Sequence, residues 1–403
     1  MILFLEPGIP PGKVERLKEL AGSEGLGFRV LDEALAGRRL VLLAAEPSRP
    51  NPDLIARVRS WHGVERSISF ADPHPMVSSA PETLVIVPRW AGLSAEKAAP
   101  PESREIRVGP GHFLWIAGPC SVENPEYLGE TATRVARAGA TMLRGGAYKP
   151  RTSPYSFQGL GREGLLLLAA VARDVGLALV SEVLDPRDVD FVSQHTDLLQ
   201  IGARNMQNFA LLKEAGASGH PVLLKRGPAA SIEELLLAAE YLLDAGCPGL
   251  MLCERGVKSL DPLRPTLLDL GVIPALREHC PFPLIVDPSH GTGQRSRVIP
   301  MAKAAVAAGA DGVMVEVHVR PEEARSDGSQ ALLPEDLERL AADLSVLAEL
   351  EGRTLSPLVR DCPAEGEEAL TLLPRSSARS SDGSRADRGT VRGDPSFRRS
   401  KST

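Results

Sequence analysis

Eight short apolar runs, separated by segments with helical spacing, constrain the fold of this chain more than any other feature. Each run is apolar throughout, which is typical of strands buried on both faces. The segments between them, such as 231–245 and 296–308, repeat apolar residues at the helical period. This alternation predicts a closed parallel (β/α)8 barrel at 110–352, with an open doubly wound sheet as the alternative. The eight runs are 113–118, 141–145, 177–182, 197–201, 221–225, 249–253, 283–287 and 312–317.

The rest of the chain divides into three further zones. Residues 1–72 carry apolar runs and amphipathic segments in the order βαββαβ, which predicts a small α+β ferredoxin-like domain. Residues 73–109 are rich in Pro, Ala, Ser and Glu, with one short apolar run, so we predict a linker. Residues 353–403 lose apolar periodicity and end in a Ser- and Arg-rich stretch, which predicts a disordered basic tail.

Composition excludes several classes of partner. The net charge of −6 gives no global attraction to nucleic acid, so any anion site must come from a local cluster of cations. The longest apolar stretches, such as 164–171, are much shorter than the roughly 20 residues that cross a bilayer. The five cysteines form no CxxC pair, and the start MILFLEPG does not resemble a signal peptide. We therefore predict a reduced, cytoplasmic protein that binds neither nucleic acid nor membrane.

Polar side chains stand at or just beyond the C-terminal end of nearly every predicted strand. In a barrel these ends converge on one mouth, where barrel enzymes place their chemistry. A set this complete predicts a single functional site, although surface loops are polar in any protein. The residues are Cys120, Glu123, Arg144, Lys149, Arg151, Glu182, Ala203, Arg204, Asn205, Lys225, Arg226, Cys253, Glu254, Arg255, Asp287, His290, Glu316 and His318.

Four residues of this mouth form a candidate metal site: Cys120, His290, Glu316 and Asp327. A thiolate, an imidazole and two carboxylates are a mixed soft and hard ligand set, which suits Mn, Fe, Co or Zn. Taken singly, a buried Cys is as often a small hydrophobe, and a His is as often a neutral packing residue. His318 lies two residues beyond Glu316 and is a candidate to support the ligands. We interpret Cys253 as structural.

A second set of residues is cationic and predicts anionic ligands. The loop 143–161 combines Arg and Lys with glycines that admit a close ligand and prolines that stiffen the chain. A solvated basic turn is the alternative for this loop alone. Cations gathered in one pocket repel one another unless anions neutralise them. The site therefore fits two phosphorylated substrates, or one phosphate-carboxylate compound and a further phosphate. The six cations are Arg144, Lys149, Arg151, Arg204, Lys225 and Arg255.

Several long motifs give the chain a family resemblance. From residue 1 to about 350 it resembles 3-deoxy-D-arabino-heptulosonate 7-phosphate (DAHP) synthase, in the short-barrel type with an N-terminal ferredoxin-like domain. Members of that family condense phosphoenolpyruvate with erythrose 4-phosphate and release phosphate, which opens the shikimate route to aromatic amino acids. The motifs are AGPCSVEN, LRGGAYKPRTSPYSFQGLG, QIGARN, PVLLKRG, CERG, VDPSHGTG, and VEVH followed by SDGSQAL.

The resemblance implies roles for individual positions. It makes Cys120, His290, Glu316 and Asp327 the metal ligands, and it assigns Arg151 and Thr152 to the sugar phosphate. Lys149 is the implied general acid, with Glu182 or a path through His290 handling the proton of water. The family also implies a homotetramer and an aromatic amino acid effector bound through the N-terminal domain, with a passive oligomerisation domain as the alternative. The positions implied to bind phosphoenolpyruvate are Arg144, Lys149, Ala203, Arg204, Lys225 and Arg255.

Two other functions and one departure remain open at this point. The related 3-deoxy-D-manno-octulosonate 8-phosphate synthase shares the barrel and ligands, but its loop would read KANRSS where this chain has KPRTSP, and it has no N-terminal domain. A barrel that has lost catalysis and senses a ligand is the other alternative. The chain also reads RPTLLD where the family usually has RNTLD, so Pro265 is expected to reshape a loop beside the sugar phosphate.

Overall fold

The computed structural model describes residues 2–5, 9–23, 27–35, 38–44, 61, 64–68, 73–80, 85–88, 105–151 and 153–355. The predicted basic tail lies outside these residues, apart from its first three. The second helix that the βαββαβ order predicts, near 52–61, lies outside them apart from residue 61, and so does the predicted substrate residue Thr152.

Eight parallel strands form a closed barrel, as the sequence predicts. Neighbouring strands in the chain are neighbours in space throughout, and the barrel closes where Gly312–Glu316 pairs in parallel with Leu114–Gly118. Each strand lies within about one residue of its predicted bounds. The strands are β7 (His112–Gly118), β8 (Met142–Arg144), β9 (Ala178–Val183), β10 (Leu198–Ile201), β11 (Val222–Lys225), β12 (Leu250–Glu254), β15 (Leu284–Val286) and β16 (Gly312–Glu316).

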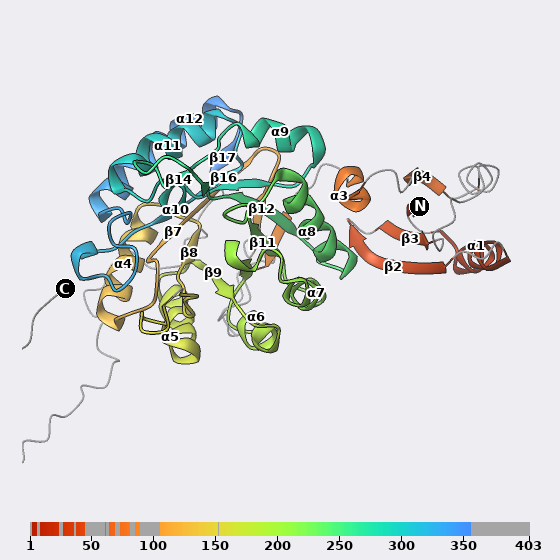
Figure 1. Ribbon diagram of the computed structural model, residues 1–403, viewed down its shortest axis with the longest axis horizontal. Helices are drawn as coiled ribbons and strands as arrows, with labels where there is room; N and C mark the ends of the chain where they lie inside the picture. Colours follow the sequence, from red (N-terminus) through yellow and green to blue (C-terminus); the bar gives the residue numbers. More distant parts are fainter. Residues whose placement is uncertain are drawn as a thin grey trace, which may run out of the picture. The chain divides into compact units, whose positions relative to one another are not determined.

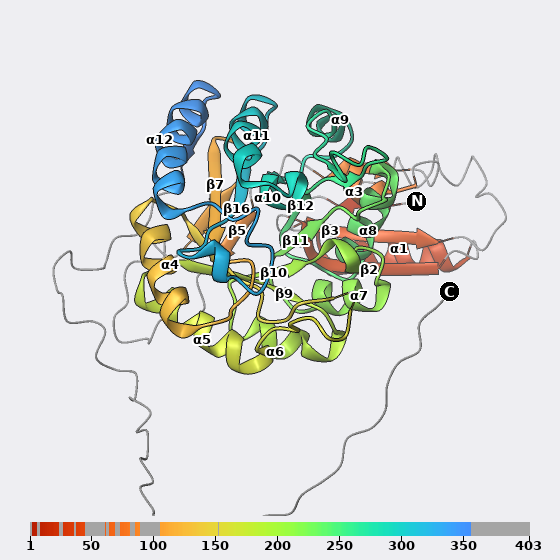
Figure 2. The ribbon, with the colours of Figure 1, turned by 60° about the vertical axis from the view of Figure 1, so that its left-hand side comes forward.

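Helices surround the strands on the outside of the barrel (Figures 1 and 2). Helix α8 shows why one begins where it does: Ser231 accepts a hydrogen bond from the Glu234 backbone while the Glu234 side chain bonds back, which satisfies two N–H groups left open by the first turn. The helices are α4 (Pro125–Arg137), α5 (Gly161–Asp174), α6 (Val189–Ser193), α7 (Phe209–Ala217), α8 (Ile232–Asp244), α9 (Val272–His279), α10 (Pro288–Thr292), α11 (Arg295–Ala307) and α12 (Pro334–Leu350).

Alternate residues of each strand pack on opposite sides, which explains the continuous apolar runs. In β7, Phe113 and Trp115 belong to the cluster that joins the strands to the helices. Leu114 and Ile116 belong to a second cluster inside the barrel, with Met142, Met251 and Met314 from other strands. Because both faces of each strand are buried, no position of the run can be polar without a partner.

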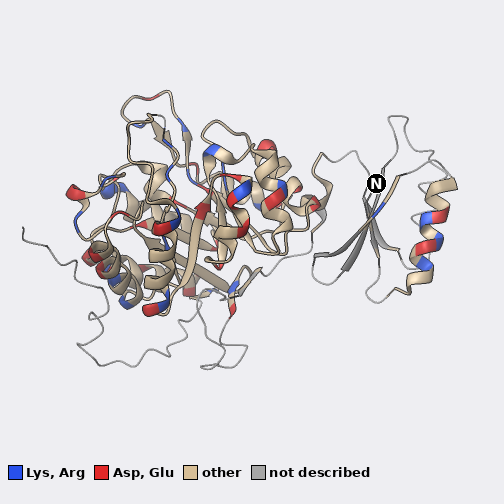
Figure 3. Ribbon diagram, turned by 90° about the horizontal axis from the view of Figure 1, so that it is seen from below, with Lys and Arg blue, Asp and Glu red and all other residues tan. Residues whose placement is uncertain are grey.

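The four described strands of the N-terminal unit form one antiparallel sheet. Its sheet runs β2-β3-β1-β4 with antiparallel neighbours, and leucines of β1 pack with Val14 and Leu17 of α1. Charged residues of both signs lie along α1 (Figure 3). The elements are β1 (Ile2–Leu5), α1 (Pro11–Ser23), β2 (Gly27–Leu35), β3 (Arg38–Ala44) and β4 (Val64–Ile68).

The segment predicted as a linker contributes to the barrel core. Helix α3 (Pro75–Ser79) receives two hydrogen bonds from Glu240 of α8 at its backbone N–H groups. Strands β5 (Val85–Pro88) and β6 (Glu105–Val108) form an antiparallel pair, and their buried valines and Ile106 join the cluster inside the barrel. Strand β5 lies within the apolar run 82–88 that the sequence showed, and its buried valines belong to the core. Its partner β6 was not foreseen, and the domain boundaries stay a prediction.

Two short pairings complete the described elements. Strands β13 (Val257–Lys258) and β14 (Thr266–Leu267) form a hairpin, and β17 (Thr354–Leu355) pairs with the start of β7. No helix in the described residues has the length and apolar character needed to cross a membrane.

The packing of β6 leads to a stability prediction. Ile106→Ala should lower the free energy of unfolding by about 2–4 kcal/mol, because it opens a cavity in the barrel interior. Glu105→Ala, at the neighbouring exposed position, should change it by less than about 0.5 kcal/mol. Urea unfolding followed by tryptophan fluorescence measures both. Equal stability of the two variants would show that 105–108 acts only as a connection.

Candidate active site

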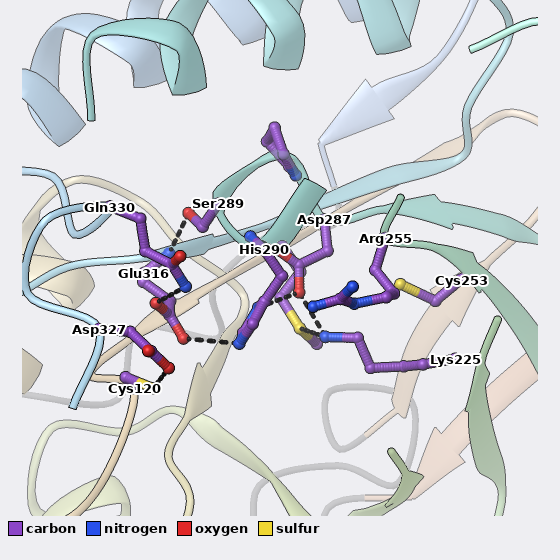
Figure 4. Close-up of polar contacts among 12 residues, drawn as sticks. Cys120, Lys225, Cys253, Arg255, Asp287, Ser289, His290, Glu316, Asp327 and Gln330 are labelled. Atoms are coloured by element: carbon purple, nitrogen blue, oxygen red, sulfur yellow. Dashed lines mark hydrogen bonds and ion pairs between the residues drawn. The ribbon is translucent and has the colours of Figure 1, made fainter. Parts of the chain in front are cut away.

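The structure brings the four predicted metal ligands together at the mouth of the barrel. One ligand atom from each of Cys120, His290, Glu316 and Asp327 lies within 4.8 Å of all the others. Cys120 and Glu316 are buried, His290 is half-buried and Asp327 is exposed, so the group opens to solvent on one side. Figure 4 shows the four side chains pointing toward one another.

Asp287 sets the orientation of His290. Asp287 ends the segment after β15 and caps α10: its Oδ1 accepts from the His290 backbone at 3.0 Å, while its Oδ2 lies 2.7 Å from His290 Nδ1. The imidazole therefore turns Nε2 toward Glu316 Oε1, 3.2 Å away. Burial raises the pKa of Asp287, but His290 and Lys225 outweigh it, so the pKa lies well below its usual range. A carboxylate behind a ligating imidazole is a common support in metal sites.

Glu316, at the end of β16, is held on both oxygens. Arg144 approaches Oε1 at 2.5 Å, Gln330 donates to Oε2 at 2.7 Å, and the Glu316 backbone N–H donates to Ser289 at 2.9 Å. Burial alone would raise the pKa of Glu316, yet the charges of His290 and Arg144 lower it to about 2. The carboxylate is therefore ionised at neutral pH, as a metal ligand must be.

Cys120 lies two residues beyond β7 and contacts Lys149. The Lys149 ammonium donates to Cys120 Sγ at 3.0 Å and to the Cys120 carbonyl at 3.2 Å. The absence of a side chain at Gly146 permits this contact, because a Cβ there would lie 2.9 Å from both the Cys120 carbonyl oxygen and the Lys149 side chain. Burial lowers the pKa of Lys149, but its contact with Cys120 and the charge of Glu316 more than compensate, so the pKa is raised.

Asp327 belongs to the long loop after β16. It is the one non-glycine residue of the described chain with a positive φ, at 49°, a conformation that few residues adopt without support. Its Oδ2 accepts from Cys120 Sγ at 3.1 Å, which joins the loop to the end of β7.

The predicted cations divide into two groups. Arg144 is paired with Glu316, and Lys225 is paired with Asp287, both pairs being buried. In the described part of the chain, no carboxylate pairs with the other four: Lys149 contacts Cys120, Arg151 donates to the Phe157 carbonyl, and Arg255 donates to Gly256. Pairing thus relieves much of the expected repulsion and leaves three guanidinium groups able to bind phosphate. These three are Arg151, Arg204 and Arg255.

Glu182 and Ala203 lie on neighbouring strand ends. Glu182, on β9, accepts from Gln200 at 3.4 Å, and no described hydrogen bond joins it to the four ligands. A Cβ at Gly202 would stand 1.9 Å from Glu182 Oε1, so the glycine before Ala203 makes room for this carboxylate. The role of Glu182 in proton transfer stays a prediction.

Three smaller predictions receive structural detail. Cys253 fills the barrel interior, and burial raises its pKa to about 12, in keeping with a structural thiol. His318 stacks edge-on with Tyr127 and accepts from the Arg320 backbone. Neither of these described contacts is with one of the four predicted metal ligands. Pro265 accepts from the Ser259 backbone within the β13–β14 loop. Of the two leucines of RPTLLD, Leu268 packs on α10 and Leu267 is exposed.

Sequence reasoning missed most of the supporting residues. Asp287 was in the predicted set, but no role was assigned to it. An Asp directly before a Pro is typical of a helix N-cap, and His290 then falls at the third helical position, where the cap accepts its backbone N–H. Gln330 and Ser289 had no local signal, because their partner Glu316 lies far away in the chain. The buried pair of Arg226 and Glu254, 3.0 Å apart, was likewise not singled out.

Comparison with known proteins identifies the family. Residues 93–351 match the family described as the DAHP synthetase I family, which is more than half of the chain. The chain belongs to the DAHP synthetase I family. The prediction from the motifs is therefore confirmed, and the fold and the activity class follow from membership.

Individual relatives agree with this assignment. The chain is 40% identical over 354 residues to a phospho-2-dehydro-3-deoxyheptonate aldolase of Thermotoga maritima, covering 87% of this chain and 99% of the relative. A crystal structure of a DAHP synthase from the same organism superposes with a TM-score of 0.64 at 38% identity, covering 88% and 98% of the two chains. A 2-dehydro-3-deoxyphosphooctonate aldolase of Desulfotalea psychrophila is 32% identical and matches 61% of this chain and 94% of its own length.

The state of the Cys120 thiol leads to a prediction about metal binding. Burial, followed by the charge of Glu316, raises the pKa of Cys120 and outweighs Lys149 and Arg144, which lower it. The thiol is therefore protonated at neutral pH, and a metal must displace its proton. Adding Mn to chelator-treated protein at pH 7 should release the proton of Cys120, and affinity should rise with pH. Calorimetry in buffers of different ionisation enthalpy measures this.

Cys120→Ser provides the control for that experiment. A serine hydroxyl does not ionise near neutral pH, so this variant should bind Mn more weakly and release about one proton fewer per ion than the native protein. Equal proton release from the native protein and the variant would show that Cys120 is not the titrating ligand.

Proposed function

We propose that this DAHP synthase condenses phosphoenolpyruvate with erythrose 4-phosphate at the barrel mouth, with a divalent metal held by Cys120, His290, Glu316 and Asp327. The observation that carries the proposal is the convergence of these four side chains beside the buried Lys149 and the guanidinium group of Arg144. Family membership supplies the reaction, and the geometry supports the assignment of residues to it.

The ligand set fits a transition metal on chemical grounds. Glu316 is ionised, Asp287 fixes the imidazole with Nε2 facing the group, and the exposed side at Asp327 leaves access for a substrate. One sulfur, one nitrogen and carboxylate oxygens accept Mn, Fe, Co or Zn, so availability decides which ion is bound. When bound, the ion would act as a Lewis acid toward the aldehyde oxygen of the sugar.

The reaction makes one carbon–carbon bond, makes one carbon–oxygen bond to water and breaks the carbon–oxygen bond to phosphate. C3 of phosphoenolpyruvate attacks the aldehyde carbon, and Lys149 donates a proton to the aldehyde oxygen, which becomes a hydroxyl. Water then adds at C2, and the C2–O bond to phosphate breaks, leaving a ketone and inorganic phosphate. We assign the proton of the water to Glu182 or to a path through His290.

The cations bind the two substrates in separate places under this proposal. Arg144, Lys149, Lys225, Arg204 and Arg255, with the backbone at Ala203, hold the phosphate and carboxylate of phosphoenolpyruvate. Arg151 and Thr152 bind the phosphate of the sugar. Guanidinium groups without a carboxylate partner suit this task, since they can bind phosphate oxygens in pairs.

Three further properties belong to the same proposal. We infer that the N-terminal unit binds an aromatic amino acid and thereby closes the barrel mouth across a homotetramer, which would couple two separate sites. We also infer that the protein acts in the cytoplasm, in keeping with its free cysteines. A tetramer whose rate is unaffected by millimolar tyrosine, phenylalanine and other end products would overturn the regulatory part.

The choice of sugar separates this function from its alternatives. Chelator-treated protein supplied with Mn should release phosphate from phosphoenolpyruvate with erythrose 4-phosphate, and should do so far more slowly with arabinose 5-phosphate. Without Mn, both rates should fall to background. Faster phosphate release with the five-carbon sugar would indicate the octulosonate enzyme. No phosphate release with either sugar, in a protein that binds Mn, would indicate a sensor.

The assigned role of Lys149 leads to a kinetic prediction. Lys149→Met at saturating Mn should lower kcat by about 10²- to 10⁴-fold, because the general acid is lost. Lys258→Met, at an exposed position, should leave kcat unchanged. Steady-state phosphate release measures both variants, and a Lys149→Met enzyme with native kcat would exclude Lys149 as the acid.

A further inference from the structure

Glu123 lies outside the ligand set and the substrate residues, yet it contacts the loop that carries Asp327. Its Oε2 accepts from the Arg325 backbone N–H at 2.7 Å, and its Oε1 accepts from the Ser326 backbone N–H at 3.1 Å. Oε1 also receives the hydroxyl of Ser121 at 2.6 Å. Both oxygens of one carboxylate are thus engaged by donors from two segments 200 residues apart in sequence.

The two segments that Glu123 joins are those that carry the neighbouring ligands Cys120 and Asp327. Ser121 follows Cys120 directly, and Ser326 precedes Asp327 directly. Their hydroxyls also meet at 2.5 Å. Asp327 itself has a positive φ, so its conformation needs support from its neighbours. The backbone donors just before it have no partner in regular secondary structure, and Glu123 supplies one.

The same loop reaches the sugar-phosphate side of the mouth. The guanidinium of Arg325 lies 3.8 Å from the centroid of the Phe157 ring, and the Phe157 carbonyl accepts from Arg151 at 3.2 Å. A cation over an aromatic face is attracted to it even when exposed. A chain of contacts therefore runs from the loop of Asp327, which Glu123 holds, through Arg325 and Phe157 to Arg151.

We propose that Glu123 is a positioning residue, a clasp that holds Asp327 in its metal-binding conformation and, through Arg325 and Phe157, aligns Arg151 for the sugar phosphate. This inference rests on the proposed function, because it takes the four ligands and the role of Arg151 from there. It adds that metal affinity and sugar binding share one structural support.

Glu123→Gln is the sharpest test, because it keeps the size of the side chain. Glutamine has one acceptor oxygen, so its amide NH₂ must face the backbone N–H of either Arg325 or Ser326. At that position two donors face each other, and one hydrogen bond is lost. The dissociation constant for Mn, measured by electron paramagnetic resonance without substrates, should rise about 10- to 100-fold. The KM for erythrose 4-phosphate should rise several-fold, and the KM for phosphoenolpyruvate should stay near native.

Three variants complete the design. Glu126→Gln, an exposed glutamate in the first turn of α4, should leave Mn affinity and both KM values unchanged. Ser326→Ala removes one hydroxyl and keeps the carboxylate, so it should weaken Mn binding by a smaller factor and serves if Glu123→Gln folds poorly. Phe157→Leu should raise the KM for erythrose 4-phosphate while Mn affinity stays native, since it breaks the path beyond the clasp.

The outcomes distinguish the role of Glu123 from the metal-ligand set of the proposed function. Native Mn affinity in Glu123→Gln and Ser326→Ala, in an assay where Asp327→Ala weakens binding, would overturn the clasp and leave the ligand set intact. Native Mn affinity in Asp327→Ala as well would overturn the ligand set and the clasp with it. Weaker Mn binding in Glu123→Gln with an unchanged KM for erythrose 4-phosphate would overturn the path to Arg151.

Discussion

A row of two buried ion pairs, joined through His290, lies across the barrel mouth and underlies the rest of the site. Arg144 pairs with Glu316, Glu316 faces His290, His290 is held by Asp287, and Asp287 pairs with Lys225. Removing one member of either ion pair would leave a buried charge without its partner, which costs several kcal/mol. This row keeps the carboxylates ionised and fixes the imidazole, so the ligand positions are set before any ligand arrives.

The barrel explains how such a row can be built. Its members come from the ends of four strands or the residues just after them, and parallel strands in a closed barrel bring these ends to one rim. The continuous apolar runs that form the strands also exclude water from beneath the rim. The low effective dielectric there strengthens each ion pair, and the same burial makes an unpaired charge costly. Both the stability of the fold and the chemistry of the site therefore require that a buried charge such as Glu316 has a partner.

The sequence was sufficient for features that repeat or act locally. The strand runs, the capped helix after Ser231 and the polar residues at strand ends each carry a local pattern, and all lie where they were expected. The supporting residues do not, since Gln330 and Glu123 act on partners brought near only by folding. Strand β6 escaped notice for a similar reason: its four residues alternate exposed and buried positions inside a Pro- and Ala-rich segment.

The central claim is that Cys120, His290, Glu316 and Asp327 bind one metal ion together. X-ray absorption on protein loaded with one equivalent of Zn tests it most directly, because a thiolate ligand scatters at about 2.3 Å, farther than nitrogen or oxygen. The account predicts one sulfur and a remainder of nitrogen and oxygen ligands, with the sulfur absent in Cys120→Ser. A shell of nitrogen and oxygen alone in the native protein would contradict it.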